Sequence, residues 1–238
     1  MKKLLVAIIG LFGMLNLHAE GFSLSNLGVR LSIDASLPGD VSTGDGYTKV
    51  KMYENGPGFS FGAVYRFDLM GSLYIEPGLS LYYNTYSVNK SYILEEINND
   101  WVPSMPEIEL TKRSLRMFGL RVPVTVGYRL PLAPSFNLDL FTGPMFDFGM
   151  SADLHWGYKY DKYDLSYSAS QYGSDRPLNR FNCYWNFGAG VTFAHHYSLS
   201  LQYDLGMCNR AKKVDTGMAV VKPKFHSNLV QLTFGYNF

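Results

Sequence analysis

The sequence ends in Leu229-Val-Gln-Leu-Thr-Phe-Gly-Tyr-Asn-Phe238, where apolar residues alternate with small or polar ones. Successive side chains of a β-strand point to opposite faces, so this stretch predicts a strand with one apolar face. The apolar face carries Phe234, Tyr236 and Phe238 and has no charged residue. The stretch therefore predicts a β-rich fold, and its alternation can be sought along the rest of the chain.

Seven further segments repeat this alternation, which together predicts an all-β protein of eight strands. With the last strand at 230–238, they span residues 27–35, 59–69, 73–83, 118–128, 136–148, 181–193 and 197–207. In every segment one column of alternate residues is apolar and free of charge, with only Pro77, Thr142 and Pro144 outside the apolar residue types.

The opposite columns are rich in glycine and hold a set of arginines and acids, namely Arg30, Asp34, Arg66, Asp68, Glu76, Arg121, Asp139, Asp147 and Asp204. A soluble barrel would turn its apolar columns inward and expose polar columns rich in Lys and Glu. No Lys lies in these polar columns. Small residues with Arg and Asp instead fit the narrow lumen of an eight-stranded barrel whose apolar columns face lipid.

The connections between the eight segments alternate strictly in length. Short turns lie at 70–72, 131–135 and 194–196, and long segments lie at 36–58, 84–117, 149–180 and 208–229. Outer-membrane barrels have short periplasmic turns and long external loops. We therefore predict an eight-stranded antiparallel transmembrane up-and-down β-barrel with short periplasmic turns and long extracellular loops.

The N-terminal residues predict export. Lys2 and Lys3 precede an apolar stretch, and a small residue, Ala19, ends a cleavage motif. That stretch is shorter than the ~20 residues of a spanning helix. We interpret residues 1–19 as a signal peptide cleaved near Ala19 and residues 20–238 as a single barrel domain in the bacterial outer membrane.

The charge balance argues against a nucleic-acid partner. Lys and Arg number 21 and Asp and Glu 20, so the net charge of +1 provides no basic field for nucleic acid. Only 17% of the residues are charged, where a soluble domain averages roughly 25%. The expected partners are outer-membrane lipid and lipopolysaccharide.

Aromatic residues gather at both ends of the apolar columns, as they do at membrane interfaces. Three prolines, Pro77, Pro123 and Pro144, lie inside strands, where each removes a hydrogen-bond donor from the ladder. Because a closed barrel has no free edge, we expect β-bulges at these prolines.

We expect the lumen charges to form a structural network of ion pairs, made of Arg30, Arg66, Asp68, Glu76, Arg121, Asp139, Asp147 and Asp204. The alternative is a proton or ion pathway through Arg66, Glu76, Arg121 and Asp204. Eight strands leave an interior just wide enough for side chains, which disfavours an open pore.

The histidines give little support for catalysis or metal binding. His195 and His196 share a short turn, and no nearby Cys or carboxylate completes a metal-site spacing. No metal and no cofactor are expected. A loop-borne arrangement of His155 with Asp153 and either Ser151 or Ser166 is conceivable, as in outer-leaflet lipid acyltransferases, but no spacing demands it.

The two cysteines, Cys183 and Cys208, lie near the external ends of neighbouring predicted strands. An oxidising periplasm permits a disulfide. However, Cys183 belongs to a lipid-facing column and Cys208 to a lumen column, and opposite faces of adjacent strands cannot be bridged without distortion. Parity therefore argues against a disulfide.

The long external segments carry three local signals. Alternating aromatic and apolar residues flank Asp161-Lys162, from Trp156 to Tyr167, which suggests a protruding hairpin whose edge pairs with another protein, or else a solvated tyrosine-rich loop. Ile93, Leu94, Ile97 and Trp101 have the spacing of a short helical cap. The last segment has a local charge of +4, from Arg210, Lys212, Lys213, Lys222 and Lys224 against Asp215, suited either to lipopolysaccharide phosphates or to simple solvation.

The wall sequences resemble a known family. Leu73-Tyr-Ile-Glu-Pro-Gly-Leu-Ser-Leu81, Leu120-Arg-Val-Pro-Val-Thr-Val-Gly-Tyr128, Phe141-Thr-Gly-Pro-Met145 and Leu199-Ser-Leu-Gln-Tyr-Asp-Leu-Gly-Met207 resemble those of PorT-like outer-membrane β-barrels. The terminal strand, with Phe234, Tyr236 and Phe238, resembles the signal recognised by the barrel-assembly machinery. The resemblance covers about residues 21–238 and implies how the barrel wall is built, but it does not specify a function.

From these observations we expect a non-enzymatic barrel with a structural or binding role through its extracellular loops, as an adhesin, a receptor or an accessory of an envelope complex. Its partner would be an extracellular or envelope protein. A loop-site enzyme acting on lipid A or phospholipid, or a narrow channel, is the alternative.

Overall fold

The computed structural model describes residues 24–42, 49–89, 109–160, 163–174, 176–215, 220–221 and 223–238. The expected signal peptide at 1–19 and the helical spacing at 93–101 lie outside the described residues.

The described residues form one short 3-10 helix and fifteen strands, several of them only two residues long. In chain order they are η1 (Leu24–Asn26), β1 (Leu27–Pro38), β2 (Val41–Ser42), β3 (Lys49–Val50), β4 (Tyr53–Glu54), β5 (Gly56–Tyr65), β6 (Phe67–Asp68), β7 (Leu73–Val88), β8 (Glu109–Ala133), β9 (Phe136–Tyr160), β10 (Tyr163–Ser170), β11 (Phe181–Phe193), β12 (Tyr197–Gly206), β13 (Val214–Asp215), β14 (Val220–Val221) and β15 (Ser227–Asn237). Among these residues no helix is long and apolar enough to cross a membrane.

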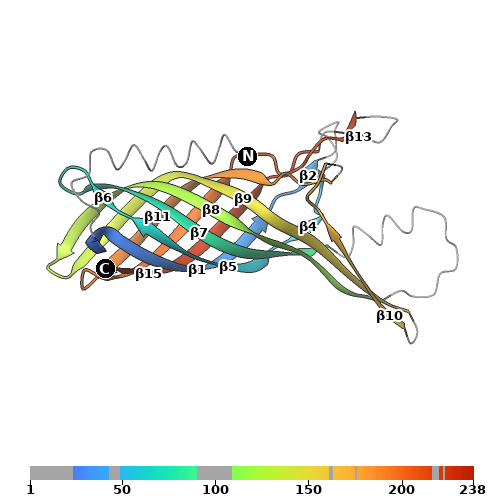
Figure 1. Cartoon of the computed structure of the whole chain (residues 1–238), viewed down its shortest axis with the longest axis horizontal. Coiled ribbons are helices and arrows are strands. Elements are labelled where there is room, and N and C mark those ends of the chain that lie inside the picture. Colours follow the sequence, from blue (N-terminus) through green and yellow to red (C-terminus); the bar gives the residue numbers. More distant parts are fainter. Residues whose placement is uncertain are drawn as a thin grey trace.

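Eight of the strands close into a ring, as predicted. Each pairs antiparallel with its neighbour in the order β1-β5-β7-β8-β9-β11-β12-β15, and β15 returns to β1 through the register Ile33↔Leu232. Tight turns join the strands at the end where β6 and the C-terminus lie, while β10 stands at the opposite end (Figure 1). The eight-stranded up-and-down barrel is therefore confirmed.

The barrel is inside-out relative to a soluble protein. Leu31 and Phe61, from the predicted apolar columns, are 52% and 59% exposed on the outer wall. Arg121 and Asp204, from the polar columns, are 1% and 0% exposed because they point into the lumen. The apolar columns face outward because lipid surrounds the wall. The charged residues face inward, where partners of opposite charge compensate for their burial.

The strands are longer than the sequence predicted. β7 continues to Val88, and β8 and β9 are 25 residues each, so strand occupies both described ends of the segment at 84–117 and much of the segment at 149–180. A membrane-spanning strand needs only about 9 to 11 residues. These strands therefore reach into the external segments, where the alternation continues with its polarity reversed.

The reversal is visible along β8. Leu120 and Phe118 point outward and Arg121 points inward in the membrane zone, whereas beyond Phe118 it is Arg116 that is exposed and Leu115 that is buried. On β9 a register shift between Phe118 and Gly119 of β8 leaves Met150 as an extra residue, which moves Ala152 to the interior. Outside the membrane, water replaces lipid around the wall, so polar residues face outward there.

The prolines do not cause the expected bulges. Pro77 pairs with Val124 and Ser80 with Arg121, so the β7–β8 ladder is interrupted between these pairs but resumes in the same register. Pro144 pairs with Trp185 within an unshifted β9–β11 ladder. The register shifts of β8 against β9 lie at Leu110–Lys112, Phe118–Gly119 and Pro131–Ala133, away from these three prolines. A missing donor thus breaks single ladder bonds, while long ladders on both sides hold the register.

The predicted hairpin at the outer end is confirmed. β9 turns back into β10 with Tyr163 opposite Tyr160 and Ser170 opposite Asp153. On its other side the outer part of β9 pairs with β8, through Ser114↔His155. The three strands form a sheet that projects beyond the barrel (Figure 1), and within the described residues β10 is paired only with β9.

Candidate functional site

The periplasmic half of the lumen holds a cluster of ion pairs. Glu76 accepts from Arg66, with nitrogen to oxygen distances of 2.7 and 2.8 Å, and pairs with Arg30 at 3.2 Å. Asp139 pairs with Arg129 at 3.0 Å and lies 4.0 Å from Arg66. These charges come from four strands, β1, β7, β8 and β9, and from Arg66 between β5 and β6, so the cluster ties opposite walls of the barrel together.

The middle of the lumen is occupied by Arg121. Its Nη1 donates to Asp34 at 2.6 Å, and its guanidinium lies over the ring of Tyr82, 4.1 Å from the centroid. Asp204 is fully buried nearby and accepts a hydrogen bond of 2.9 Å from Asn186 rather than from an arginine. The lumen is thus filled by side chains at this level.

The outer part of the lumen holds an ion pair that the sequence did not indicate. Asp147 accepts from Arg210 at 2.8 Å and from the hydroxyl of Tyr82 at 2.6 Å. Arg210 belongs to the last external segment and was assigned to a basic patch that faces either lipopolysaccharide phosphates or solvent. That assignment was wrong, because Arg210 turns inward and is buried where the low dielectric strengthens its attraction to Asp147.

Two other residues differ from the expected network. Asp68 is exposed at the periplasmic end and has no ion pair among the described side chains, because β6 continues past the rim of the barrel. Arg129 joins the network beyond the end of the predicted column at Tyr128. Extending the polar column by one position would have found Arg129, whereas no sequence signal placed Arg210 inside.

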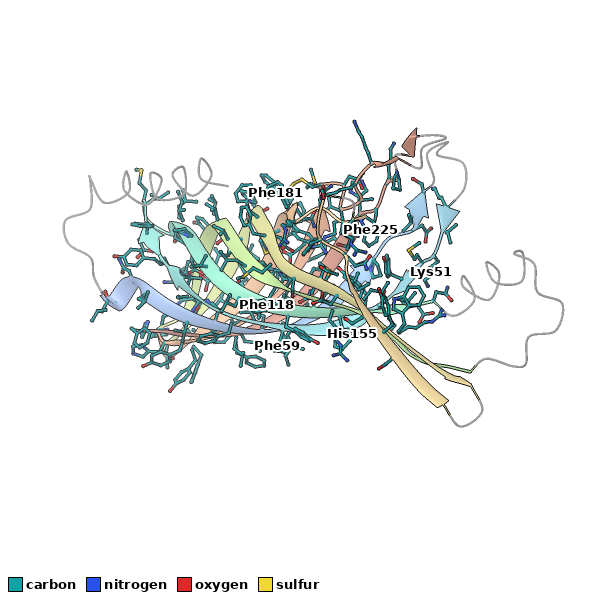
Figure 2. The ribbon with its side chains drawn as sticks, turned by 45° about the vertical axis from the view of Figure 1, so that its right-hand side comes forward. Lys51, Phe59, Phe118, His155, Phe181 and Phe225 are labelled. Carbon is teal, nitrogen blue, oxygen red and sulfur yellow. A yellow bond between two sulfur atoms is a disulfide. The ribbon has the colours of Figure 1, made fainter. Side chains whose placement is uncertain are left out.

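Side chains from several external segments close the outer mouth, and we call them the plug. Tyr53, Tyr172, Leu178 and Phe225 pack against Tyr82, Tyr86, Leu115, Met117 and Ala152 of the wall. Burial raises the pKa of Tyr172 to about 12, although the charge of Arg210 opposes this shift. The ring of Phe225 lies 5.2 Å from that of Tyr53, and Figure 2 shows Phe225 at the outer end of the barrel.

Backbone hydrogen bonds join the plug segments to one another. Asn179 N donates to the carbonyl oxygen of Arg210 at 2.7 Å, and Arg210 N donates to that of Phe225 at 2.8 Å. Lys212 N donates to Pro177 O at 2.7 Å. Because these bonds surround Arg210, they hold its side chain over Asp147.

Below the plug, the inner half of the lumen contains a cavity of about 100 Å³. Its lining mixes polar residues, among them Arg30, Arg66 and Gln231, with apolar ones such as Val64 and Phe141. It extends outward as far as Arg121, and the side chains of Tyr82, Asp147 and Arg210 fill the lumen beyond. These side chains close the cavity from the outer mouth.

Residues 18–210 match the outer membrane protein β-barrel domain family over most of the chain. The chain belongs to this family. Its place is therefore the bacterial outer membrane, as the lipid-facing columns predicted. No curated protein matches the sequence.

Solved structures similar to this outer-membrane barrel are distant in sequence. Neisserial surface protein A is 13% identical, with 92% of this chain and 100% of that chain covered at a TM-score of 0.39. OprG from Pseudomonas aeruginosa is 12% identical, with 90% and 96% covered at 0.40. Ail of Yersinia pestis is 14% identical, with 89% and 98% covered at 0.33.

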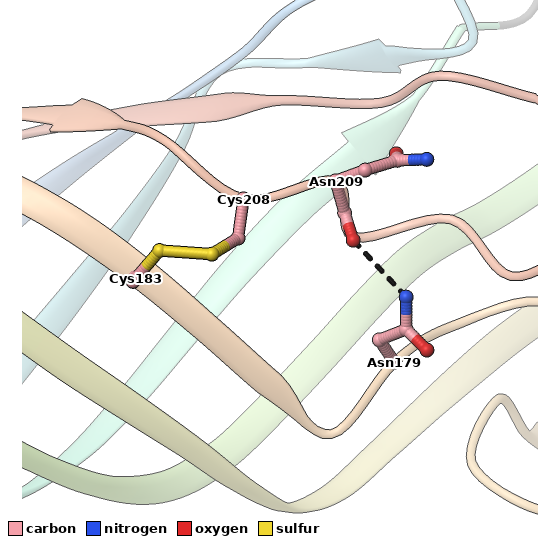
Figure 3. Close-up of a disulfide and its surroundings, with 4 residues drawn as sticks. All are labelled: Asn179, Cys183, Cys208 and Asn209. Carbon is pink, nitrogen blue, oxygen red and sulfur yellow. Dashed lines mark hydrogen bonds between the residues drawn. A yellow bond between two sulfur atoms is a disulfide. The ribbon is translucent and has the colours of Figure 1, made fainter.

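The cysteines of this barrel form a disulfide, contrary to the parity argument. Cys183 and Cys208 are bonded, with their Cα atoms 5.3 Å apart (Figure 3). The argument failed because β12 ends at Gly206, so Cys208 lies beyond the strand and its side chain is not bound to the lumen face. The bond anchors the segment that carries Arg210, and Asn179 Nδ2 donates to Asn209 O at 3.0 Å beside it (Figure 3).

The candidate catalytic residues of the barrel do not assemble. Ser151, Asp153 and His155 share the outer face of β9, where a rise of about 3.3 Å per residue puts Ser151 roughly 13 Å from His155. Ser166 lies opposite Gly157 rather than His155. No hydrogen bond joins these side chains in the described structure, so these four residues do not make the contact of a nucleophile with its base.

The two neighbouring histidines, His195 and His196, lie in the turn between β11 and β12. Ala194 and His195 adopt positive φ values of 49° and 66° in the turn, which directs their side chains apart from that of His196. His196 Nδ1 donates to Asn237 O at 2.8 Å, and its ring stacks on Tyr236. Among the described residues, no group of His, Cys, Asp and Glu could hold a metal ion.

The terminal strand is fully built into the barrel wall. Phe234, Tyr236 and Phe238 all point outward and are partly exposed, with the ring of Phe238 5.3 Å from that of Tyr236. β15 pairs with β1 on one side and β12 on the other, so this strand closes the ring. The aromatic face expected from the sequence is therefore on the lipid side.

Proposed function

We propose that this barrel is a non-enzymatic, non-conducting outer-membrane protein that presents the sheet of β8, β9 and β10 to a protein partner outside the cell or within the envelope. We further propose that it is one of the PorT-like barrels within the wider family, on the wall motifs quoted above. One observation carries the binding role, namely that β8 and β9 continue far past the membrane and end in the hairpin with β10.

The extended sheet is suited to binding because its central strand is paired on both sides and its outer strand has an edge. β9 pairs on both sides along its outer part, with β8 and with β10. A strand at the edge of a sheet displays backbone donors and acceptors that a partner strand can use, while alternate side chains set specificity. Building such a sheet costs conformational entropy, which a role at its edge would explain.

Photo-crosslinking tests this role directly. A photoreactive amino acid placed at Tyr167, on β10, should give adducts with another protein on living cells, whereas the same group at Leu31, on the lipid-facing wall, should give lipid adducts only. A barrel that folds and reaches the surface but yields no protein adduct at Tyr167 would contradict the proposal.

The plug supports the absence of conduction. Arg210, Tyr82 and Asp147 occupy the lumen between the inner cavity and the outside. Purified protein in planar bilayers should therefore show no discrete conductance steps. Reproducible steps from the wild-type barrel would favour the narrow channel instead.

The separation of Ser151 from His155 supports a non-enzymatic role. The alternative, an enzyme acting on lipid A or phospholipid, predicts that His155→Ala changes the mass spectrum of cellular lipid A or phospholipid. The binding role predicts an unchanged spectrum in cells that carry an equal amount of the variant.

Targeting and assembly form part of the same proposal. Residues 1–19 would be removed as a signal peptide, and the barrel-assembly machinery would recognise Phe234, Tyr236 and Phe238 in the domain at 20–238. N-terminal sequencing of the mature protein tests the first step. Phe238→Ala, which removes an exposed ring, should lower the amount of assembled barrel without lowering synthesis.

A further inference from the structure

The lipid-facing aromatic residues at the outer rim are followed directly by a polar face on the same strands. Tyr83 of β7 pairs with Phe118 of β8, and Phe118 pairs with Ser151 of β9. Paired residues point to the same side of a sheet, so these three side chains mark one level of the outer wall. His155 lies beyond Phe118 toward the projecting sheet (Figure 2).

Two polar rows cross four strands immediately above this level. The lower row is Thr85, Arg116, Asp153 and Ser170, and the upper row is Ser87, Ser114, His155 and Ser168. We call the two rows with Ser151 the hydroxyl face. All of these side chains are exposed or half-buried, while the alternate residues Tyr86, Leu115 and Ala152 are buried against the plug.

The position of the hydroxyl face is that of the lipid headgroups. The lower row lies two residues along the strands beyond the aromatic rim, about 7 Å, and the upper row lies four residues beyond it, about 13 Å. Aromatic side chains occupy the interface between hydrocarbon and headgroups, so the rows above them meet the saccharide part of the outer leaflet. The outward residues of β8 thus change from apolar to polar at Phe118, at the level where the membrane changes from hydrocarbon to headgroups.

The charges around the outer end complement an anionic surface. Nine cationic side chains lie around the outer end in the described structure, against three carboxylates, Asp40, Glu54 and Asp153. The nine are Lys49, Lys51, Arg113, Arg116, Arg176, Arg180, Lys212, Lys213 and Lys224. Of the nine, Arg116 is the one within the hydroxyl face. It lies opposite Asp153 but forms no ion pair among the described side chains, so its guanidinium fork remains available.

A planar guanidinium binds phosphate through two parallel hydrogen bonds, and serine hydroxyls both donate to and accept from sugar hydroxyl and amide groups. We propose that the hydroxyl face binds the phosphorylated saccharide headgroup of outer-leaflet lipopolysaccharide, with Arg116 holding a phosphate and the serine rows contacting the sugars. This site lies on the wall side of the sheet and does not depend on the β10 edge or on a protein partner. Arg210 is withdrawn from the basic patch expected in the last segment, whereas Lys213 and Lys224 of that patch remain exposed.

Binding of a truncated lipopolysaccharide to the purified full-length barrel in detergent tests the site. Arg116→Gln should weaken binding roughly tenfold or more, the loss expected for one charge-assisted contact. Arg176→Gln is the matched control, since it removes an equal charge from the plug side of the outer end and should change binding less than about twofold. The double variant Ser114→Ala with Ser168→Ala should weaken binding by roughly two- to tenfold.

Two further probes identify the chemistry that is recognised. The same lipopolysaccharide with its phosphates removed should bind wild type about as weakly as the phosphorylated lipid binds the Arg116→Gln variant. Phosphatidylethanolamine, a zwitterionic lipid, should not compete. Equal loss in Arg116→Gln and Arg176→Gln would show diffuse charge attraction and overturn the site, as would wild-type binding that is indifferent to the phosphates. Heating should shift the gel mobility of each variant as much as it shifts that of the wild type, which confirms that each variant is folded.

Discussion

The membrane-spanning and extracellular parts of β8 show how one strand responds to two solvents. Between Phe118 and Tyr128 the outward residues are apolar and the inward residues include Arg121, whereas between Arg113 and Met117 the outward residues are polar and Leu115 lies in the core. The backbone ladder continues through both parts. The period of two therefore reports a strand in either medium, while the face that is apolar reports which medium surrounds it.

Arg121 in the membrane part should be the most sensitive position. Arg121→Ala leaves Asp34 buried without its partner, so we expect a loss of about 3 to 5 kcal/mol in the free energy of unfolding. Urea unfolding in detergent micelles measures it. An unchanged midpoint would mean that the lumen charges do not hold the walls together.

Leu115 tests the extracellular part through the same quantity, the free energy of unfolding. It is fully buried between the wall and the plug, so Leu115→Ala should cost about 2 to 5 kcal/mol through lost transfer energy and a cavity. Leu31→Ala, on the lipid-facing wall, is the control and should cost less, because detergent fills the space. Equal costs at both positions would show that Leu115 is not in a packed core.

The disulfide tests how far the plug depends on its anchor. Cys208→Ser frees the segment that carries Arg210, and we expect a loss of about 2 to 4 kcal/mol together with faster proteolysis of residues 207–226. Cys183→Ser should give the same result. If trypsin cleaves oxidised and reduced wild-type protein at equal rates, the bond does not hold the plug.

Arg116 completes the comparison, five residues from Arg121 on the same strand. Its side chain is exposed and lacks an ion pair among the described residues, so Arg116→Ala should change the free energy of unfolding by no more than about 0.5 kcal/mol. Urea unfolding of both arginine variants in one detergent gives the contrast. A large effect at Arg116 would place it in a stabilising contact that the fold does not show.

Much of the membrane part could be predicted from residues such as Leu31, Arg121 and Asp204, because each obeys the alternation locally. Because Glu76 lies in a polar column, an ion pair in the lumen could be predicted for it. Which arginines it pairs with could not be predicted. The extracellular part was harder. Leu115 and Met117 were assigned to a loop, since an apolar residue in the inward column contradicts the rule that holds in the membrane.

Sequence alone determined the strand count, the topology, the direction in which the wall faces and the compartment. Lipid acts on each residue of the wall separately, so the pattern can be read one position at a time. Tertiary structure decided that Arg210 reaches Asp147, 63 positions away in the chain, that Cys208 meets Cys183, and that β8 and β9 extend beyond the membrane. These features depend on contacts between distant segments, whose energy arises only when the barrel has closed and the plug has packed into its mouth.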